Sequence, residues 1–246
     1  MFLSVAVFLL SPIAILESTE ARGYAFMLFF GTSGSALLVR YLAHGNMALL
    51  PFYAIVTTLG IWSHLVTVVV PMGHAAYLLG TFVMIGKEKH VARSRVLFGF
   101  SAILIAALTT ITVLSPVIPD LLSDSHTFSA TRNDQPDLFG REGLWSLLGL
   151  GGAWSPIGAI PGLILLCLGC LGAVKDALTK RALLVTGLPI LIAIVLVSGL
   201  GTWVYARFLI FGLTFSVLAI TAGAHLLWTR SRFAGVLAMI LLLGGC

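Results

Sequence analysis

Charged residues are scarce in this sequence. Only 9% of the 246 residues are Asp, Glu, Lys or Arg, whereas 59% are hydrophobic; a typical soluble domain has about 25% charged residues. A water-soluble fold cannot hide that much apolar surface, so the composition excludes an ordinary soluble domain. The net charge of +5 does not indicate nucleic acid as a partner, because the basic residues stand in short stretches between apolar runs, where orientation in a membrane explains them.

Cysteine is scarce as well. Cys167, Cys170 and Cys246 all lie inside apolar segments, so no disulfide framework can be derived from them. The pair Cys167-x-x-Cys170 is best interpreted as two small hydrophobic residues, because a metal or redox site would need a second ligand pair or a thioredoxin-like context. The sequence therefore identifies no metal site and no cofactor.

Alternation of polar and apolar residues, typical of an outer-membrane barrel, is also lacking. Long apolar runs are present instead, and about 20 such residues are needed for one spanning helix. We expect an all-α integral membrane protein, a polytopic helical bundle of eight or nine transmembrane helices forming one transmembrane domain over 1–246. The stretch from Met47 to Ile85 is too long for one helix and is divided at Ser63-His64. The expected spans are 1–16, 23–42, 47–63, 65–85, 96–119, 156–174, 182–200, 207–228 and 233–246.

The basic residues predict the orientation, because Lys and Arg concentrate in cytoplasmic loops. With the N-terminus inside, ten basic residues face the cytoplasm against two acidic ones, and the opposite face has four basic residues against seven acidic ones. The inside set is Arg40, the Lys87-Glu88-Lys89-His90 and Arg93/Arg95 loop, Lys175, Asp176, Lys180, Arg181, Arg230 and Arg232. The outside set is Glu17, Glu20, Arg22, Asp120, Asp124, Arg132, Asp134, Asp137, Arg141, Glu142 and Arg207.

The largest polar segment, from Asp120 to Glu142, is expected to be an extracytoplasmic loop. A Gly/Pro-rich segment follows and runs to Gly162; together they define a region over 120–155 that we interpret as a loop plus an interfacial or re-entrant element. The first and last apolar runs are shorter than a full span, which favours a piece of a longer multi-pass protein, placed in a bacterial cytoplasmic membrane.

Three polar groups at helix ends are candidates for chemistry, since ionisable residues near the hydrocarbon are costly. They all lie on the predicted extracytoplasmic side, although interfacial anchoring would also explain the first and third groups, and a lone His is more often structural. Glu20 and Tyr24 share one face if they begin a helix, the imidazole of His64 could bind a phosphate or a sugar hydroxyl, and Arg suits bidentate phosphate recognition. The groups are Glu17-Ser-Thr-Glu20-Ala-Arg22-Gly-Tyr24, Trp62-Ser63-His64, and Trp203-Val-Tyr205-Ala-Arg207-Phe208.

The order of these motifs resembles the GT-C superfamily of membrane glycosyltransferases, of the protein mannosyltransferase and aminoarabinose transferase type. Ser11-Pro12 and Glu20-Ala-Arg22-Gly-Tyr24 resemble the family's step from an acidic residue through Arg and a small residue to Tyr. Leu59-Gly60-Ile-Trp-Ser63-His64 resembles its Leu-Gly-x-x-Ser/Thr-His step. Tyr205-Ala-Arg207-Phe208 resembles its late Arg-Tyr-Leu turn, with Phe208 in place of Tyr.

The resemblance implies transfer of a sugar, with inversion, from a polyprenyl-phosphate donor in the membrane lipid to an acceptor at the extracytoplasmic face. The family's catalytic carboxylate, the general base, precedes the region that matches, so it is expected to be missing here, and Glu20 is a weak substitute. Arg207, with Tyr205, would hold the donor phosphate, while Arg22, Tyr24 and His64 would line the sugar or acceptor side. A divalent metal is suggested by the resemblance alone.

Two other functions remain open. A transporter or lipid flippase would show repeats and ionisable groups at the membrane midplane, and no convincing repeat is found. A non-catalytic assembly subunit would tolerate substitution of Arg207 and His64. Arg40, His74 and His225 receive no role, and His74 is expected to be a packed, hydrogen-bonded interior group.

Overall fold

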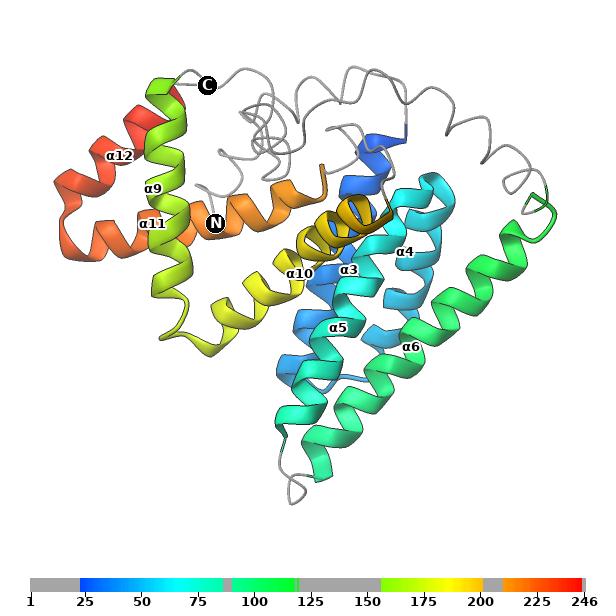
Figure 1. The fold of residues 1–246 in the computed structure, drawn as a ribbon. Coiled ribbons are helices and arrows are strands. Elements are labelled where there is room, and N and C mark those ends of the chain that lie inside the picture. Colours follow the sequence, from blue (N-terminus) through cyan, green and yellow to red (C-terminus); the bar gives the residue numbers. More distant parts are fainter. Residues whose placement is uncertain (1–22, 86–89, 118, 120–155, 201–209, 245–246) are drawn as a thin grey trace.

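A computed structural model describes residues 23–85, 90–117, 119, 156–200 and 210–244 of the chain (Figure 1). All regular elements in these ranges are helical. They are α3 (Tyr24–His44), α4 (Leu49–Ser63), the short 3-10 helix η1 (Leu65–Val68), α5 (Val69–Met84), α6 (His90–Leu114), α9 (Pro156–Gly172), α10 (Ala177–Leu200), α11 (Gly212–Arg230) and α12 (Arg232–Gly244).

Five helices in the described part are long and apolar enough to cross a membrane. Two shorter apolar helices, Leu49–Ser63 and Ile160–Gly172, accompany them. The expected all-α, membrane-spanning class therefore agrees with the structure, whereas the expected count of eight or nine spans is not confirmed. The expected span over 1–16 lies outside the described residues. The five long helices are Tyr24–His44, Leu65–Met84, Ala92–Leu114, Ala177–Leu196 and Gly212–Arg230.

The predicted turn at Ser63-His64 is confirmed. Helix α4 ends at Ser63, and His64 has an extended backbone with φ −161° and ψ 118° before η1 begins. The Ser63 hydroxyl donates to the carbonyl of Gly60 at 2.8 Å, and the backbone N–H of His64 donates to the same carbonyl at 3.1 Å. This carbonyl thus keeps its helical i+4 partner and also accepts from the Ser63 side chain, so it is fully satisfied at the end of the helix.

The basic segment around Arg93 and Arg95 was predicted to be a loop, and this is wrong: both residues belong to the first turns of α6. The Arg93 guanidinium lies 4.6 Å from the ring centroid of Phe82 on α5, and Arg95 packs against Gly45 at the turn that joins α3 to α4. These contacts hold the cations against neighbouring helices. The hydropathy boundary at 96 therefore marks the edge of the apolar stretch and not the end of the helix.

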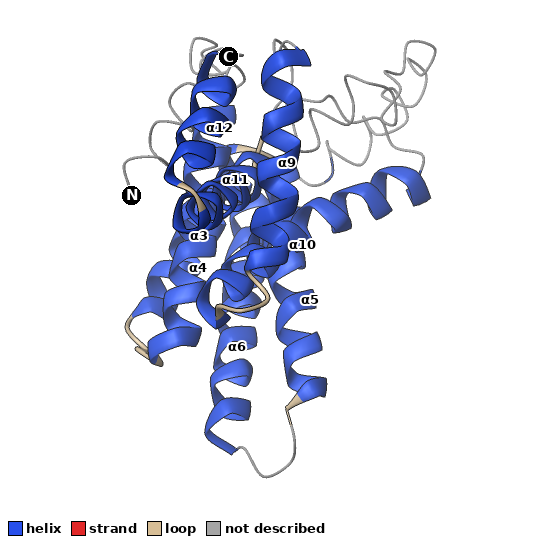
Figure 2. Ribbon diagram, turned by 90° about the vertical axis from the view of Figure 1, so that its left-hand side faces the viewer, coloured by secondary structure: helices blue, strands red, loops and turns tan. Residues whose placement is uncertain are grey.

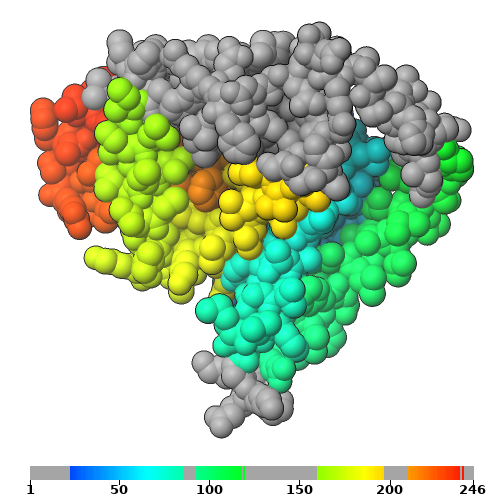
Figure 3. All heavy atoms as spheres, viewed as in Figure 1, coloured from blue at the N-terminus to red at the C-terminus, as the bar shows by residue number. Residues whose placement is uncertain are grey.

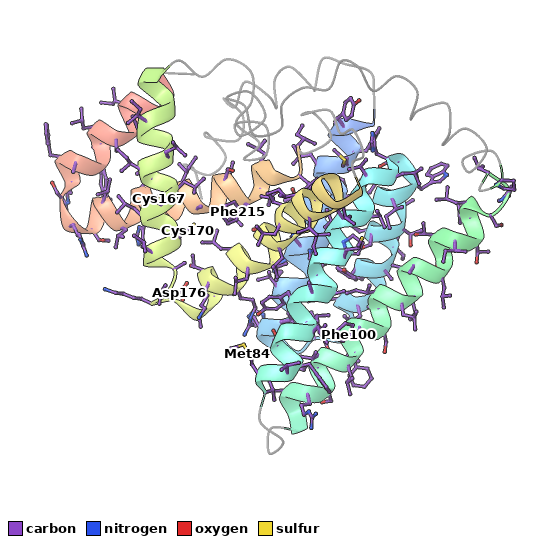
Figure 4. All side chains as sticks on the ribbon, in the orientation of Figure 1. Met84, Phe100, Cys167, Cys170, Asp176 and Phe215 are labelled. Atoms are coloured by element: carbon purple, nitrogen blue, oxygen red, sulfur yellow. The ribbon has the colours of Figure 1, made fainter. Side chains whose placement is uncertain are left out.

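The beginning of α10 is corrected in the same way. Lys180 and Arg181 lie in the helix, which starts at Ala177 instead of at 182. Asp176 caps this helix, because its carboxylate accepts hydrogen bonds from the hydroxyl of Thr179 and, at 2.8 Å, from the Thr179 backbone N–H. These hydrogen bonds, the side-chain one foremost, lower the pKa of Asp176. The exposed carboxylate stands at the turn between α9 and α10 (Figure 4).

Helices α3 to α6 run roughly side by side, and α6 leans outward toward its C-terminal end (Figure 1). In the second half of the chain, α9 is upright in both ribbon views, whereas α11 runs across the page in Figure 1 and is seen end-on in Figure 2. Helix α11 therefore crosses α9 steeply. The space-filling view places α9 and α12 on one flank of the molecule and α6 on the other (Figure 3).

Two glycines make the crossing of α9 and α11 possible. A Cβ atom on Gly169 would come within 1.8 Å of the Ala219 carbonyl oxygen, and one on Gly223 within 1.9 Å of the Leu165 carbonyl oxygen. The two backbones are thus in direct contact, which is how small residues drive helix association in lipid. Helix α11 also packs on α10, where Phe215 lies against Gly187.

Candidate functional site

Two of the predicted site residues, Tyr24 and His64, are described by the structure, and they lie together. Glu20, Arg22, Tyr205 and Arg207 fall outside the described residues, as does the whole region 120–155. The candidate site is therefore built from the beginning of α3 and the end of α4, which meet at one end of the helix bundle.

The two segments touch through their backbones. A Cβ atom on Gly23 would lie 2.7 Å from the carbonyl oxygen of Ser63 and 3.9 Å from Cβ of His64. Contacts under 3.0 Å of this kind force something to shift, so a larger residue at position 23 would separate α3 from the turn after α4. Gly23 is the small residue between Arg and Tyr in the first motif, and its contact with Ser63 joins that motif to the second one.

The aromatic rings of Tyr24 and His64 stand next to each other. Their centroids are 5.4 Å apart and the planes are tilted by 38°, within the range of favourable aromatic pairs. Tyr24 is only 4% exposed, whereas His64 is half-buried. The buried Tyr24 ring therefore packs against the imidazole on its interior side, and His64 is the more exposed member of the pair.

The hydrogen bond of His64 fixes its tautomer. Its Nδ1 accepts from the backbone N–H of Val66 at 3.3 Å and so caps η1. A nitrogen that accepts carries no proton, so the neutral ring has its N–H on Nε2. Burial lowers the pKa of His64, which keeps the ring neutral near pH 7. The half-buried imidazole therefore stands at the end of α4 as a neutral ring protonated on Nε2.

A third segment reaches the same region. Ile210, three residues after Arg207, is 1% exposed and belongs to one buried apolar cluster with Tyr24, Met27 and Leu28 of α3. The chain that follows the third motif therefore packs against the helix that begins with the first.

The cations that the structure describes on α3 and α6 lie at the other end of these helices. Arg40 is near the end of α3, and Arg93 and Arg95 are at the beginning of α6. The two ends meet, because the Tyr41 hydroxyl donates to the Arg95 carbonyl oxygen at 3.0 Å. The aromatic end with His64 and the basic end are thus separated by the length of α3, about 30 Å for its 21 residues.

His74 is a packed interior group, as expected, but its partners could not be derived from the sequence. It is 0% exposed. The Ser35 hydroxyl donates to the Gly31 carbonyl at 2.9 Å, so Ser35 must accept from Nε2 of His74 at 3.0 Å. The Tyr53 hydroxyl then donates to Nδ1 at 2.9 Å. The result is one directed chain of hydrogen bonds that links α3, α4 and α5.

No group of three or more His, Cys, Asp or Glu side chains able to hold a metal occurs among the residues that the structure describes. Cys167 and Cys170 are free thiols on α9, the first exposed and the second half-buried (Figure 4). No family model, no curated protein and no solved structure matches this chain.

Proposed function

We propose that this protein is a glycosyltransferase-like membrane protein that handles a polyprenyl-phosphate sugar at the extracytoplasmic face. The contact of Gly23 with Ser63, together with the pairing of Tyr24 and His64, is the observation that supports it. Two sequence motifs 40 residues apart, each resembling the same enzyme superfamily, meet backbone to backbone. In this proposal the protein is similar to GT-C enzymes, its donor is a polyprenyl-phosphate sugar, and the site faces the extracytoplasmic side.

Each residue has a definite part in it. The imidazole of His64 binds a hydroxyl of the sugar or a phosphate oxygen, and Tyr24 packs against the ring. Arg22, Tyr205 and Arg207 complete the site, with Arg207 on the donor phosphate because a guanidinium binds phosphate with two parallel hydrogen bonds. Deprotonation of the acceptor requires a carboxylate, and Glu20 is the nearest candidate in the sequence.

A transporter or flippase would use an ionisable group deep in the membrane, and His74 is such a group. It is fully buried, and both ring nitrogens are bonded to side chains of the protein. A group enclosed in this way is suited to holding helices together. The helix-end site around His64 therefore carries the proposal.

The test measures donor binding first and sugar transfer second. Membranes that contain the full-length protein are given radiolabelled polyprenyl-phosphate sugar, and bound donor and transferred label are counted separately. We expect His64→Ala to lower donor binding or transfer by about ten- to a hundred-fold, the loss expected when one charge-assisted hydrogen bond of about 1.5–3 kcal/mol is removed.

His44→Ala is the matched control, because His44 is an exposed histidine at the opposite end of α3. It should leave both readouts unchanged. Wild-type protein that neither binds nor consumes the donor would refute the proposed activity. Equal behaviour of the two histidine variants would refute the assignment of His64.

A further inference from the structure

A groove of about 580 Å³ lies between α4 and α6. Its floor is formed by the small or buried side chains of Leu50, Ala54 and Ala102, and more exposed apolar side chains such as Ile55 and Ile105 form its walls. The volume is in the range of small-molecule sites, about 300–1,000 Å³. Because both helices belong to the membrane-embedded bundle, this hollow opens toward lipid.

The polar atoms that line the groove are already bonded. The Ser101 hydroxyl donates to the Leu97 carbonyl at 3.1 Å, and the Thr109 hydroxyl donates to the Ile105 carbonyl at 2.8 Å. The Thr58 hydroxyl donates across the interface to the Ala106 carbonyl at 3.3 Å. The lining therefore presents methyl and methylene groups, which suit a hydrocarbon chain and not a sugar or a peptide.

A cation, Arg95, lies just beyond one end of the groove. Arg95 stands one helical turn before Phe98, which lines the groove, and its guanidinium lies over Gly45, where an added Cβ would come within 2.8 Å of it. The Tyr41 hydroxyl connects the two elements, donating to the Arg95 carbonyl at 3.0 Å and contacting the sulfur of Met47, another lining residue, at 3.8 Å. Arg95 makes no ion pair within the described residues.

We propose that the α4–α6 groove binds one acyl chain of an anionic glycerophospholipid whose phosphate pairs with Arg95. Basic pockets between transmembrane helices on the cytoplasmic side bind anionic lipid head groups, and this end of the helices is the one predicted to face the cytoplasm. The site is independent of the proposed glycosyltransferase site, which lies at the other end of α3 and α4.

The length of the groove selects the occupant. From Leu50 to Leu59 on α4 there are nine residue steps, and from Phe98 to Thr109 on α6 there are eleven, so the lined stretch is about 14 to 17 Å long at about 1.5 Å per residue. One leaflet of hydrocarbon is about 15 Å thick, half of the roughly 30 Å core. A single acyl chain fills this distance, whereas a long polyprenyl chain would exceed it.

The test uses the full-length protein in bilayers with spin-labelled lipids. Labelled phosphatidylglycerol and phosphatidylcholine are compared by the fraction that is immobilised on the protein. We expect about a five-fold preference for phosphatidylglycerol, which corresponds to about 1 kcal/mol for one basic side chain at a membrane surface. Arg95→Gln should abolish the preference, and Arg95→Lys should retain it.

Filling the hollow provides an independent variant. Ser101→Trp places an indole in the groove and should reduce immobilisation of both lipids, whereas Leu104→Trp, at an exposed position of α6 that does not line it, should not. Equal immobilisation of the two lipids by the wild type would overturn the proposal. The proposal would also be overturned if Arg95→Gln kept the lipid preference, or if Ser101→Trp left the immobilised fraction unchanged. Cross-linking of two copies of the protein through a cysteine placed at position 101 would show that a second copy, and not a lipid, fills the groove.

Discussion

The buried chain of hydrogen bonds from Tyr53 through His74 and Ser35 to the Gly31 carbonyl gives a sharp prediction of stability. Tyr53→Phe keeps the ring, which is fully buried, and removes only the hydroxyl that donates to Nδ1 of His74. The imidazole would then hold an acceptor with no donor in the protein interior. An unsatisfied buried group costs about 1–3 kcal/mol, while hydrogen bonds between membrane helices average about 0.6 and reach about 1.7 kcal/mol. We expect a loss of about 1–2 kcal/mol.

The free energy of unfolding can be measured by titration with sodium dodecyl sulfate in mixed micelles, followed by circular dichroism. Tyr77→Phe is the matched control, since Tyr77 lies on α5, is half-buried and makes no side-chain hydrogen bond within the described residues. It should change stability by less than about 0.5 kcal/mol. Equal losses in the two tyrosine variants would refute the role assigned to the Tyr53 hydroxyl.

A double-mutant cycle separates the bond from the packing. His74→Leu alone leaves the hydroxyls of Tyr53 and Ser35 without their imidazole partner, while Tyr53→Phe combined with His74→Leu removes one of these mismatches. The double variant should therefore lose less than the sum of the two single losses, by about 1 kcal/mol, because paired removal of both partners is cheaper than removal of one. Strict additivity would show that the two side chains are not coupled.

Four further outcomes are expected. Gly169→Val should lower the free energy of unfolding, measured by denaturant titration, by at least about 2 kcal/mol, because the Val side chain would meet the α11 backbone. Gly80→Ala is the control and should be neutral or slightly stabilising, because an added Cβ there meets nothing within 4 Å. Gly45→Ala should cost about 1–2 kcal/mol in the same titration, because Gly45 has φ +74°. Gly23→Val should raise the accessibility of a cysteine placed at position 63 to a thiol reagent, since it must displace the Ser63 carbonyl. Burial places the pKa of His64 below 6.5, so as the pH falls the unfolded chain takes up the proton before the folded one does. The free energy of unfolding should therefore be at its full value above about pH 7 and decline below 6.5. Thermal unfolding should show a flatter decline for His64→Asn, because Asn can still cap η1.

Much of the helix pattern could be predicted from the sequence, because a run of apolar residues in lipid has no alternative to a helix. The expected 23–42 and 47–63 correspond to α3 and α4 within two residues. The turn at Ser63-His64 was predictable for the same reason, since the run was too long for one span. The starts of α6 and α10 could not be predicted, because both helices extend beyond the apolar stretch. In α6 the Arg93 guanidinium packs on Phe82, and at the start of α10 Asp176 accepts hydrogen bonds from Thr179.

The orientation of α11 could not be predicted. Hydropathy reports the length and polarity of a segment, and Gly212–Arg230 has the composition of an ordinary span. Its steep crossing over α9 depends on the direct backbone contact at Gly169 and Gly223, which requires both helices in three dimensions. The two glycines that make this contact lie further along the chain than the Gly/Pro-rich segment that ends at Gly162.

Of the predicted site residues, the structure describes Tyr24 and His64 and shows their rings next to each other, an arrangement that could not be predicted from the sequence. Sequence placed Tyr24 and His64 on one side of the membrane, yet it gave no sign that Tyr24 is buried or that His64 Nδ1 caps η1. Both facts depend on local geometry where the beginning of α3 meets the end of α4, a contact that forms only after folding. Glu20, Arg22, Tyr205 and Arg207 stay predictions.

The contact between Gly23 and Ser63 also constrains how this protein can change over time. A methyl group at position 23 would displace the carbonyl of residue 63, so any relative that replaces this glycine must also move the turn after α4. Positions 23 and 63 should therefore vary together, and their joint pattern, a small residue before Tyr and a Ser-His turn 40 residues later, should identify distant relatives better than either motif alone.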